Sequence, residues 1–153
     1  MARRATHVPV GALSGMLAVA LRTPDGQKDR MVLEMIGAAI GGATAARWPD
    51  VLEPAHHPRH RKVAHSWVAG FGLLGAAPEK VRAWEAACRN LSIWAATRDG
   101  DMARAPAERA RFRVVALVAS ILAGLLVGIA AGYLSHLALD GLDPSGLPML
   151  GLA

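Results

Sequence analysis

Residues 114–139, VVALVASILAGLLVGIAAGYLSHLAL, decide the class of fold because they form one uninterrupted apolar run. A helix needs roughly 20 apolar residues to cross the hydrocarbon core of a membrane, and this run is long enough. Arg109, Arg111 and Arg113 precede the run, and Tyr133 lies near its far end. Such flanking residues are typical of interfacial anchors. The stretch therefore predicts a membrane-spanning helix.

Three shorter apolar stretches precede it, at 8–21, 31–46 and 63–77. Each alone is also compatible with a buried helix of a soluble bundle. Beside 114–139, they predict short or tilted helices of a multi-pass membrane protein, an all-α bundle forming a single domain over residues 1–153. The composition agrees, with 53% hydrophobic residues, 19% charged residues and 16 glycines. Glycines allow helices to approach closely inside a bilayer.

Residues 78–113 form a charged insert between the third and fourth apolar stretches. Its apolar residues recur at helical spacing: Val81, Trp84, Cys88, Leu91 and Ala95. Pro78 suits the first turn of a helix, and Asp99-Gly100 is a stop signal. One interpretation is an amphipathic helix in the membrane interface. The other is a helix packed on the bundle with Trp84 and Trp94 in its core.

Charge and cysteine content narrow the classes of function. The net charge is +5, and the chain has 1 Cys, so neither an internal disulfide nor a cysteine-based zinc site can form. The basic residues are spread along loops without a recognition motif or an aromatic platform, so no nucleic-acid partner is expected. A basic membrane protein beside anionic lipid has the same charge signature.

Histidines concentrate in HHPRHRKVAHS, residues 56–66. If the four apolar stretches run up and down in turn, one end of the bundle collects every histidine and several acids: His7, Asp50, Glu53, His56, His57, His60, His65, His136, Asp140 and Asp143. His136 and Asp140 are four residues apart and share a helix face. With His65 and Asp50 they predict a site for a divalent metal ion, and the ligand types suit zinc best and manganese or iron as alternatives. The alternative is a set of ordinary interfacial histidines.

Four segments carry a family resemblance: THVPVGALSG (6–15), GAAIGGATAARWPDVLEP (37–54), HRKVAHS (60–66) and GYLSHLALDGLDPSGLPML (132–150). Their order resembles the YdjM-type family of membrane-bound metal-dependent hydrolases and, more distantly, zinc-dependent phospholipase C. The resemblance implies a bacterial inner-membrane protein. It also implies a set of metal ligands: His7, Asp50, His60, His65, His136 and Asp140. Leu52 stands where the family has a second acid, and Glu53 follows it.

A metal at this end would activate water for attack on a phosphoester or similar bond of an anionic substrate, with a lipid as one candidate. Asp50 or Glu53 is the expected general base, and the resemblance puts Arg61 and Ser66 around the metal or the substrate. Arg59, Arg61 and Lys62 favour an anionic substrate, or alternatively anchor lipid headgroups. The competing class is a non-catalytic scaffold or partner-binding membrane protein, whose metal site is structural or degenerate.

Overall fold

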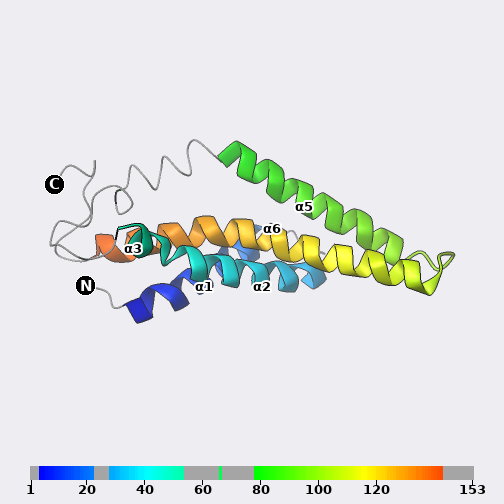
Figure 1. Cartoon of the computed structure of the whole chain (residues 1–153), viewed down its shortest axis with the longest axis horizontal. Helices are drawn as coiled ribbons and strands as arrows, with labels where there is room; N and C mark the ends of the chain where they lie inside the picture. Colours follow the sequence, from blue (N-terminus) through cyan, green and yellow to red (C-terminus); the bar gives the residue numbers. More distant parts are fainter. Residues whose placement is uncertain (1–3, 23–27, 54–65, 67–77, 143–153) are drawn as a thin grey trace.

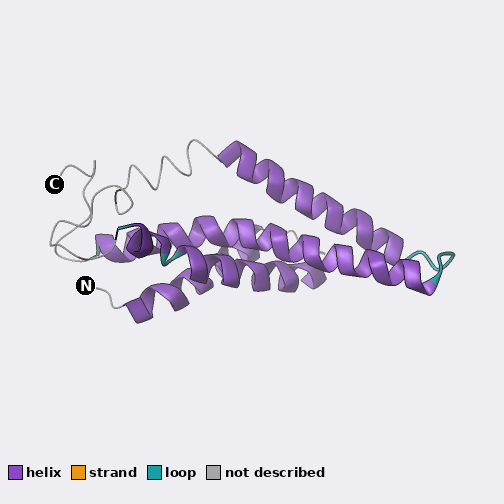
Figure 2. Cartoon of the chain, viewed as in Figure 1, coloured by secondary structure: helices purple, strands orange, loops and turns teal. Residues whose placement is uncertain are grey.

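The computed structural model describes residues 4–22, 28–53, 66 and 78–142. These residues form five helices: α1 (Arg4–Arg22), α2 (Lys28–Ala45), α3 (Trp48–Leu52), α5 (Pro78–Asp99) and α6 (Pro106–Gly141). No strand occurs among them, as Figure 2 shows. The predicted all-α class is confirmed. The third predicted stretch, 63–77, lies outside the described residues except for Ser66.

Helix α6 is the central element, because α1, α2 and α5 all pack against it. Helices α1 and α2 lie along its C-terminal half, whereas α5 lies along its N-terminal half and returns antiparallel to it (Figure 1). Among the described helices, α6 is the one long and apolar enough to cross a membrane. The number of spans in the bundle therefore stays a prediction.

Glycines set the distance between α2 and α6. Gly124, Gly128 and Gly132 recur every fourth residue and so lie on one face of α6. A Cβ atom at these positions would collide with the backbone carbonyls of α2 at Glu34, Ala38 and Gly42, respectively. The two helices are therefore parallel and in backbone contact, which only a row of residues without side chains permits.

Helix α1 also packs against α2 through glycines, and it runs in the opposite direction to α2. Gly11 contacts Gly42, and Gly15 contacts Ala38, so α1 runs antiparallel to α2. The outer face of α1 exposes Leu13, Leu17 and Leu21, and the outer face of α2 similarly exposes an apolar row: Val32, Ile36 and Ile40. The three-helix bundle of α1, α2 and α6 thus has an apolar exterior as well as a small-residue interior.

Helix α5 begins at Pro78 and ends at Asp99, as its sequence signals predicted. Its packed face differs from the expected one, since Glu85 is buried whereas Trp84 and Trp94 are 61% and 44% exposed. The interpretation that placed both tryptophans in the core is wrong. Charged residues face inward because Glu85 and Arg89 have partners there, on α1 at Arg22 and on α2.

Tyr133 is a second correction. The sequence suggested an interfacial anchor, but the side chain is 4% exposed. It packs with Ala45 and Leu137 beside Trp48, where α2 passes into α3. Tyr133 therefore packs the end of α2 against α6, within one turn of the polar residue His136 on the same helix.

Candidate metal centre

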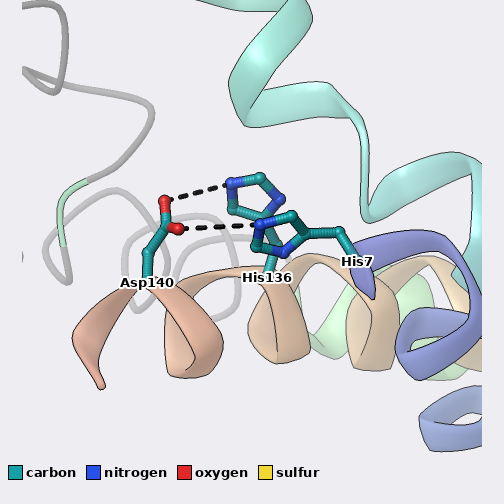
Figure 3. Close-up of side chains that lie close together, drawn as sticks. All are labelled: His7, His136 and Asp140. Carbon is teal, nitrogen blue, oxygen red and sulfur yellow. Dashed lines mark ion pairs between the residues drawn. The ribbon is translucent and has the colours of Figure 1, made fainter. Parts of the chain in front are cut away.

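Three predicted ligands, His7, His136 and Asp140, meet at one end of the bundle. His7 comes from the first turn of α1, and the other two come from the last two turns of α6. All three are buried, with relative exposures of 3%, 0% and 4%. Figure 3 shows both imidazole rings facing the carboxylate of Asp140. The predicted convergence is confirmed for these three residues.

Helix packing explains why the first turn of α1 meets the end of α6. Gly11, one turn after His7, packs against Gly42 and the Cβ of Ala46. Gly132, one turn before His136, packs against the same Gly42. Helices α1 and α6 therefore both pack against α2 at Gly42. His7 and His136 each lie one turn beyond this contact, and their side chains meet past the end of α2.

The two imidazoles lie parallel to each other, with ring centroids 4.1 Å apart and an interplanar angle of 24°. His136 Nε2 is 3.4 Å from Asp140 Oδ2, and His7 Nε2 is 3.7 Å from Asp140 Oδ1. One carboxylate thus faces both rings (Figure 3). Two protonated imidazoles at this separation would repel each other, which disfavours a doubly cationic stack.

A backbone contact fixes the tautomer of His136. Its Nδ1 is 2.6 Å from the carbonyl oxygen of Ala46. A carbonyl only accepts hydrogen bonds, so Nδ1 carries the hydrogen and donates it. In the neutral ring Nε2 then presents a lone pair toward the carboxylates. A second ring nitrogen hydrogen-bonded to a carbonyl is the usual support of a histidine that binds a metal.

Local structure at the end of α2 supplies that carbonyl. The last carbonyls of a helix have no intrahelical partner, and α2 ends at Ala45. Residues 46–47 form a turn, and Pro49 then starts α3 at a first-turn position that suits proline. The turn exposes the Ala46 carbonyl toward α6, and the short helix α3 brings Asp50 to the same place.

Asp50 lies at the edge of the triad. Its Oδ1 is 3.9 Å from His136 Nε2, and its side chain is 27% exposed, compared with 5% for Asp140. Asp50 is therefore the member of the site that reaches solvent. Its position is compatible with a fourth ligand or with a base that contacts water.

The donor set fits a divalent metal ion. A four-coordinate ion with ligands at about 2.1 Å needs ligand atoms about 3.4 Å apart. The triad offers one atom from each residue, all within 4.8 Å of one another. The two imidazoles also approach the two separate oxygens of Asp140, His136 to 3.4 Å from Oδ2 and His7 to 3.7 Å from Oδ1. Two imidazoles with carboxylates suit zinc, manganese or iron. A metal ion would be held by His7, His136 and Asp140.

The remaining predicted residues are only partly placed. His60, His65, Arg59, Arg61 and Lys62 belong to residues 54–65, outside the described part of the chain. Ser66 is described and is 3% exposed. Glu53 directly follows the last residue of α3 and caps this helix, since its backbone N–H donates to the carbonyl of Pro49 at 2.9 Å. Leu52, at the position of the resembling family's second acid, is 67% exposed.

Sequence reasoning missed two supports of this site, the Ala46 carbonyl and the Gly42 packing position. The turn before Trp48-Pro49 was a signal for the first, because a helix that ends before a proline leaves carbonyls free. The spacing of Gly11, Gly42 and Gly132 was visible, but no local pattern pairs glycines from three separate helices.

Comparisons of the chain with protein-family models, with curated proteins and with solved structures find no match.

Proposed function

We propose that this protein is a membrane-bound, metal-dependent hydrolase that acts on an anionic substrate at the membrane interface. The observation that carries the proposal is the meeting of His7, His136 and Asp140, all buried, around one small volume. Buried ionisable groups are costly in an apolar bundle and normally mark a site. A hydrogen-bonded Nδ1 on His136 leaves its Nε2 directed at two carboxylates, which suits a cation between them.

An imidazolium–carboxylate cluster is the simplest alternative for the same residues. It would need a proton on His136 Nε2, beside the stacked ring of His7. A neutral His7 can still donate one N–H to Asp140, but a divalent ion binds one atom from each of the three residues, and these atoms lie within 4.8 Å of one another. The metal assignment is preferred because it accounts for all three residues with one ligand.

The bound metal would supply Lewis acidity and lower the pKa of a water molecule toward neutrality. Asp50, as the more exposed carboxylate, is placed to accept a proton from that water. The Ala46 carbonyl holds the His136 ring in its orientation. The bulk of the bundle excludes solvent from the opposite side of the triad, so substrate approaches from the side of Asp50.

The class of substrate follows from position and charge. The site lies at the C-terminal end of the apolar run of α6, with His136 inside the run and Asp140 directly after it, and we place this end at the headgroups. The sequence after α3 carries three cations within four residues, namely Arg59, Arg61 and Lys62. Arginine pairs well with phosphate. We therefore favour a lipid phosphoester or another amphiphilic phosphate, with Arg61 and Ser66 as contacts.

Two further observations support the membrane part of the proposal. The exposed leucines and isoleucines of α1 and α2 support additional membrane-inserted helices around α6. The resemblance to YdjM-type hydrolases supports a multi-pass protein of the bacterial inner membrane that uses zinc. His60 and His65 would complete the coordination or bind a second ion.

A non-catalytic scaffold with a structural metal is the second candidate. It is favoured by Leu52, an exposed apolar side chain where the resembling family has an acid. A structural site has all coordination positions filled by protein, whereas a catalytic site keeps one for water. Both candidates share the metal, and they differ in whether phosphoesters are cleaved.

The test is elemental analysis of the detergent-purified protein, followed by a screen of phosphoesters. We expect near-stoichiometric zinc, manganese or iron in the wild type and its loss in Asp140→Asn and His136→Ala. Asp101→Asn, an exposed carboxylate in the α5–α6 turn, is the matched control and should keep the metal. A wild-type protein without metal after reloading would overturn the proposal. Metal without cleavage of any phosphoester would favour the scaffold.

A further inference from the structure

A groove lies where α2, α5 and α6 meet, at the end of the bundle opposite the metal centre. Its volume is about 200 Å³. Each helix contributes both a charged and an apolar side chain to the lining: Arg30 and Leu33 from α2, Asp99 and Ala96 from α5, Arg113 and Leu117 from α6. The space exists because small side chains face each other between α5 and α6.

The floor of the groove has its polar groups satisfied. Ser92 of α5 and Ser120 of α6, each 1% exposed, share a hydrogen bond of 2.7 Å. Ser120 also donates to the Ala116 carbonyl at 3.0 Å, so its oxygen accepts the shared bond from Ser92. The floor therefore offers little that a polar ligand would need. Leu33, Ala96 and Leu117 suit an apolar chain instead.

The charged side chains give the groove a net positive charge. Arg113 makes two contacts with Asp99, from Nε to Oδ2 at 3.0 Å and from Nη2 to Oδ1 at 3.2 Å. This pair is formally neutral, and Arg30 adds one positive charge to the lining. The side chain of Arg113 is 71% exposed, so it remains accessible to a further anion.

The position of the groove matches a membrane boundary. Arg113 is the last charged residue before the apolar run that begins at Val114. The preceding residues 98–113 carry Arg98, Arg104, Arg109 and Arg111 as well. Clusters of arginine beside a membrane-spanning helix are attracted to anionic headgroups. Leu117 and Ser120 lie one and two turns further along α6, toward the bilayer interior.

We propose that this groove binds one anionic phospholipid from the surrounding membrane. One acyl chain lies along Leu33, Ala96 and Leu117, and the phosphate is held by Arg30 and Arg113. The inference rests on the membrane association in the proposed function but not on its metal centre. A free phosphate ion would gain nothing from the apolar walls, and a zwitterionic lipid would gain less from the net positive charge.

Native mass spectrometry of the detergent-purified protein tests this inference with two lipids of identical acyl chains, phosphatidylglycerol and phosphatidylcholine. We expect one retained phosphatidylglycerol per chain and roughly fivefold weaker retention of phosphatidylcholine, the ratio that about 1 kcal/mol for the one net positive charge of the lining gives. Ala96→Trp fills the groove and should abolish retention of both lipids. Arg30→Gln with Arg113→Gln should retain lipid but lose the preference.

Ala83→Trp places the same side chain on an exposed part of α5 outside the groove and should change nothing. Leu33→Trp, on α2, serves as a second filling variant if Ala96→Trp fails to fold by circular dichroism. Equal retention of both lipids by the wild type would overturn the inference, as would full retention by the folded filling variant. Metal content is measured in the same samples, so loss of lipid with metal retained separates this inference from the hydrolase proposal.

Discussion

Glu34 of α2 accepts two hydrogen bonds from the guanidinium of Arg89 on α5, at 3.1 Å from Nε and 2.6 Å from Nη2. Arg89 Nη2 also lies 3.5 Å from Glu85, which pairs in turn with Arg22 of α1 at 2.9 Å. The Glu34 and Glu85 side chains are 5% and 6% exposed. This chain of charges joins α1, α2 and α5.

Removing one partner of this pair should destabilise the bundle strongly. Arg89→Leu leaves the buried Glu34 carboxylate uncompensated, and we expect a loss of about 3 kcal/mol, the lower end for a buried pair because Arg89 is partly exposed. Unfolding in detergent, followed by circular dichroism, measures the loss. The double variant Glu34→Leu/Arg89→Leu should lose less than Arg89→Leu alone. Equal losses in the single and double variants would show that the charge pair is not the cause.

Gly128→Ala should separate α2 from α6. The added Cβ would meet the backbone of Ala38, which cannot move aside as a flexible side chain can. We expect a loss of about 1–3 kcal/mol or more, the range for overpacking, with reduced metal content because His136 follows on the same helix. Gly100→Ala is the control, since its Cβ would lie 3.6 Å from the Thr97 carbonyl in ordinary contact. A Gly128→Ala protein as stable as Gly100→Ala would contradict the packing account.

Chelation should loosen the attachment of α1 to α6. The metal ion would join His7 in the first turn of α1 to Asp140 in the last turn of α6. A ligand that binds only the folded state stabilises it, by about 4 kcal/mol when present at 1,000 times its Kd. We therefore expect EDTA to lower the Tm and to speed amide hydrogen exchange in residues 4–10. Asp140→Asn should show neither response, and a wild-type Tm indifferent to EDTA would argue against a metal at this place.

Substitution of Asp50 and substitution of Asp140 should differ in their effects on metal content and activity. Asp140→Asn removes a buried carboxylate that faces both imidazoles, so metal and activity should be lost together. Asp50→Asn alters the exposed carboxylate at the edge of the site. As a general base it should account for a loss of about 10²–10⁴-fold in kcat with the metal retained. Loss of metal from Asp50→Asn would instead make this residue a ligand.

The sequence was sufficient for features that depend on local spacing. The apolar run predicted α6, and Pro78 with Asp99-Gly100 marked both ends of α5. The spacing of four residues placed His136 and Asp140 on one face, where the structure has them 3.4 Å apart. The up-and-down order of the helices placed His7 at the same end of the bundle, and the family resemblance named it as a ligand, because a single histidine near the start of an apolar helix has no pattern of its own.

Features that depend on distant partners could not be predicted. The helical pattern of α5 predicts that its charged residues face outward. Glu85 and Arg89 instead point inward, because Glu85 pairs with Arg22 of α1 and Arg89 pairs with Glu34 of α2. Tyr133 followed the rule for interfacial aromatics, but the end of α2 covers it. The stacking of His7 on His136 required the crossing of three helices around Gly42, which no single stretch of sequence contains.

The stack of His7 on His136 also fixes an order of events during biosynthesis. His7 belongs to the first described helix and His136 to the last, so the growing chain cannot assemble the site until α6 has left the ribosome and packed. Partly made chains that lack α6 would lack two of the three residues of the triad, His136 and Asp140.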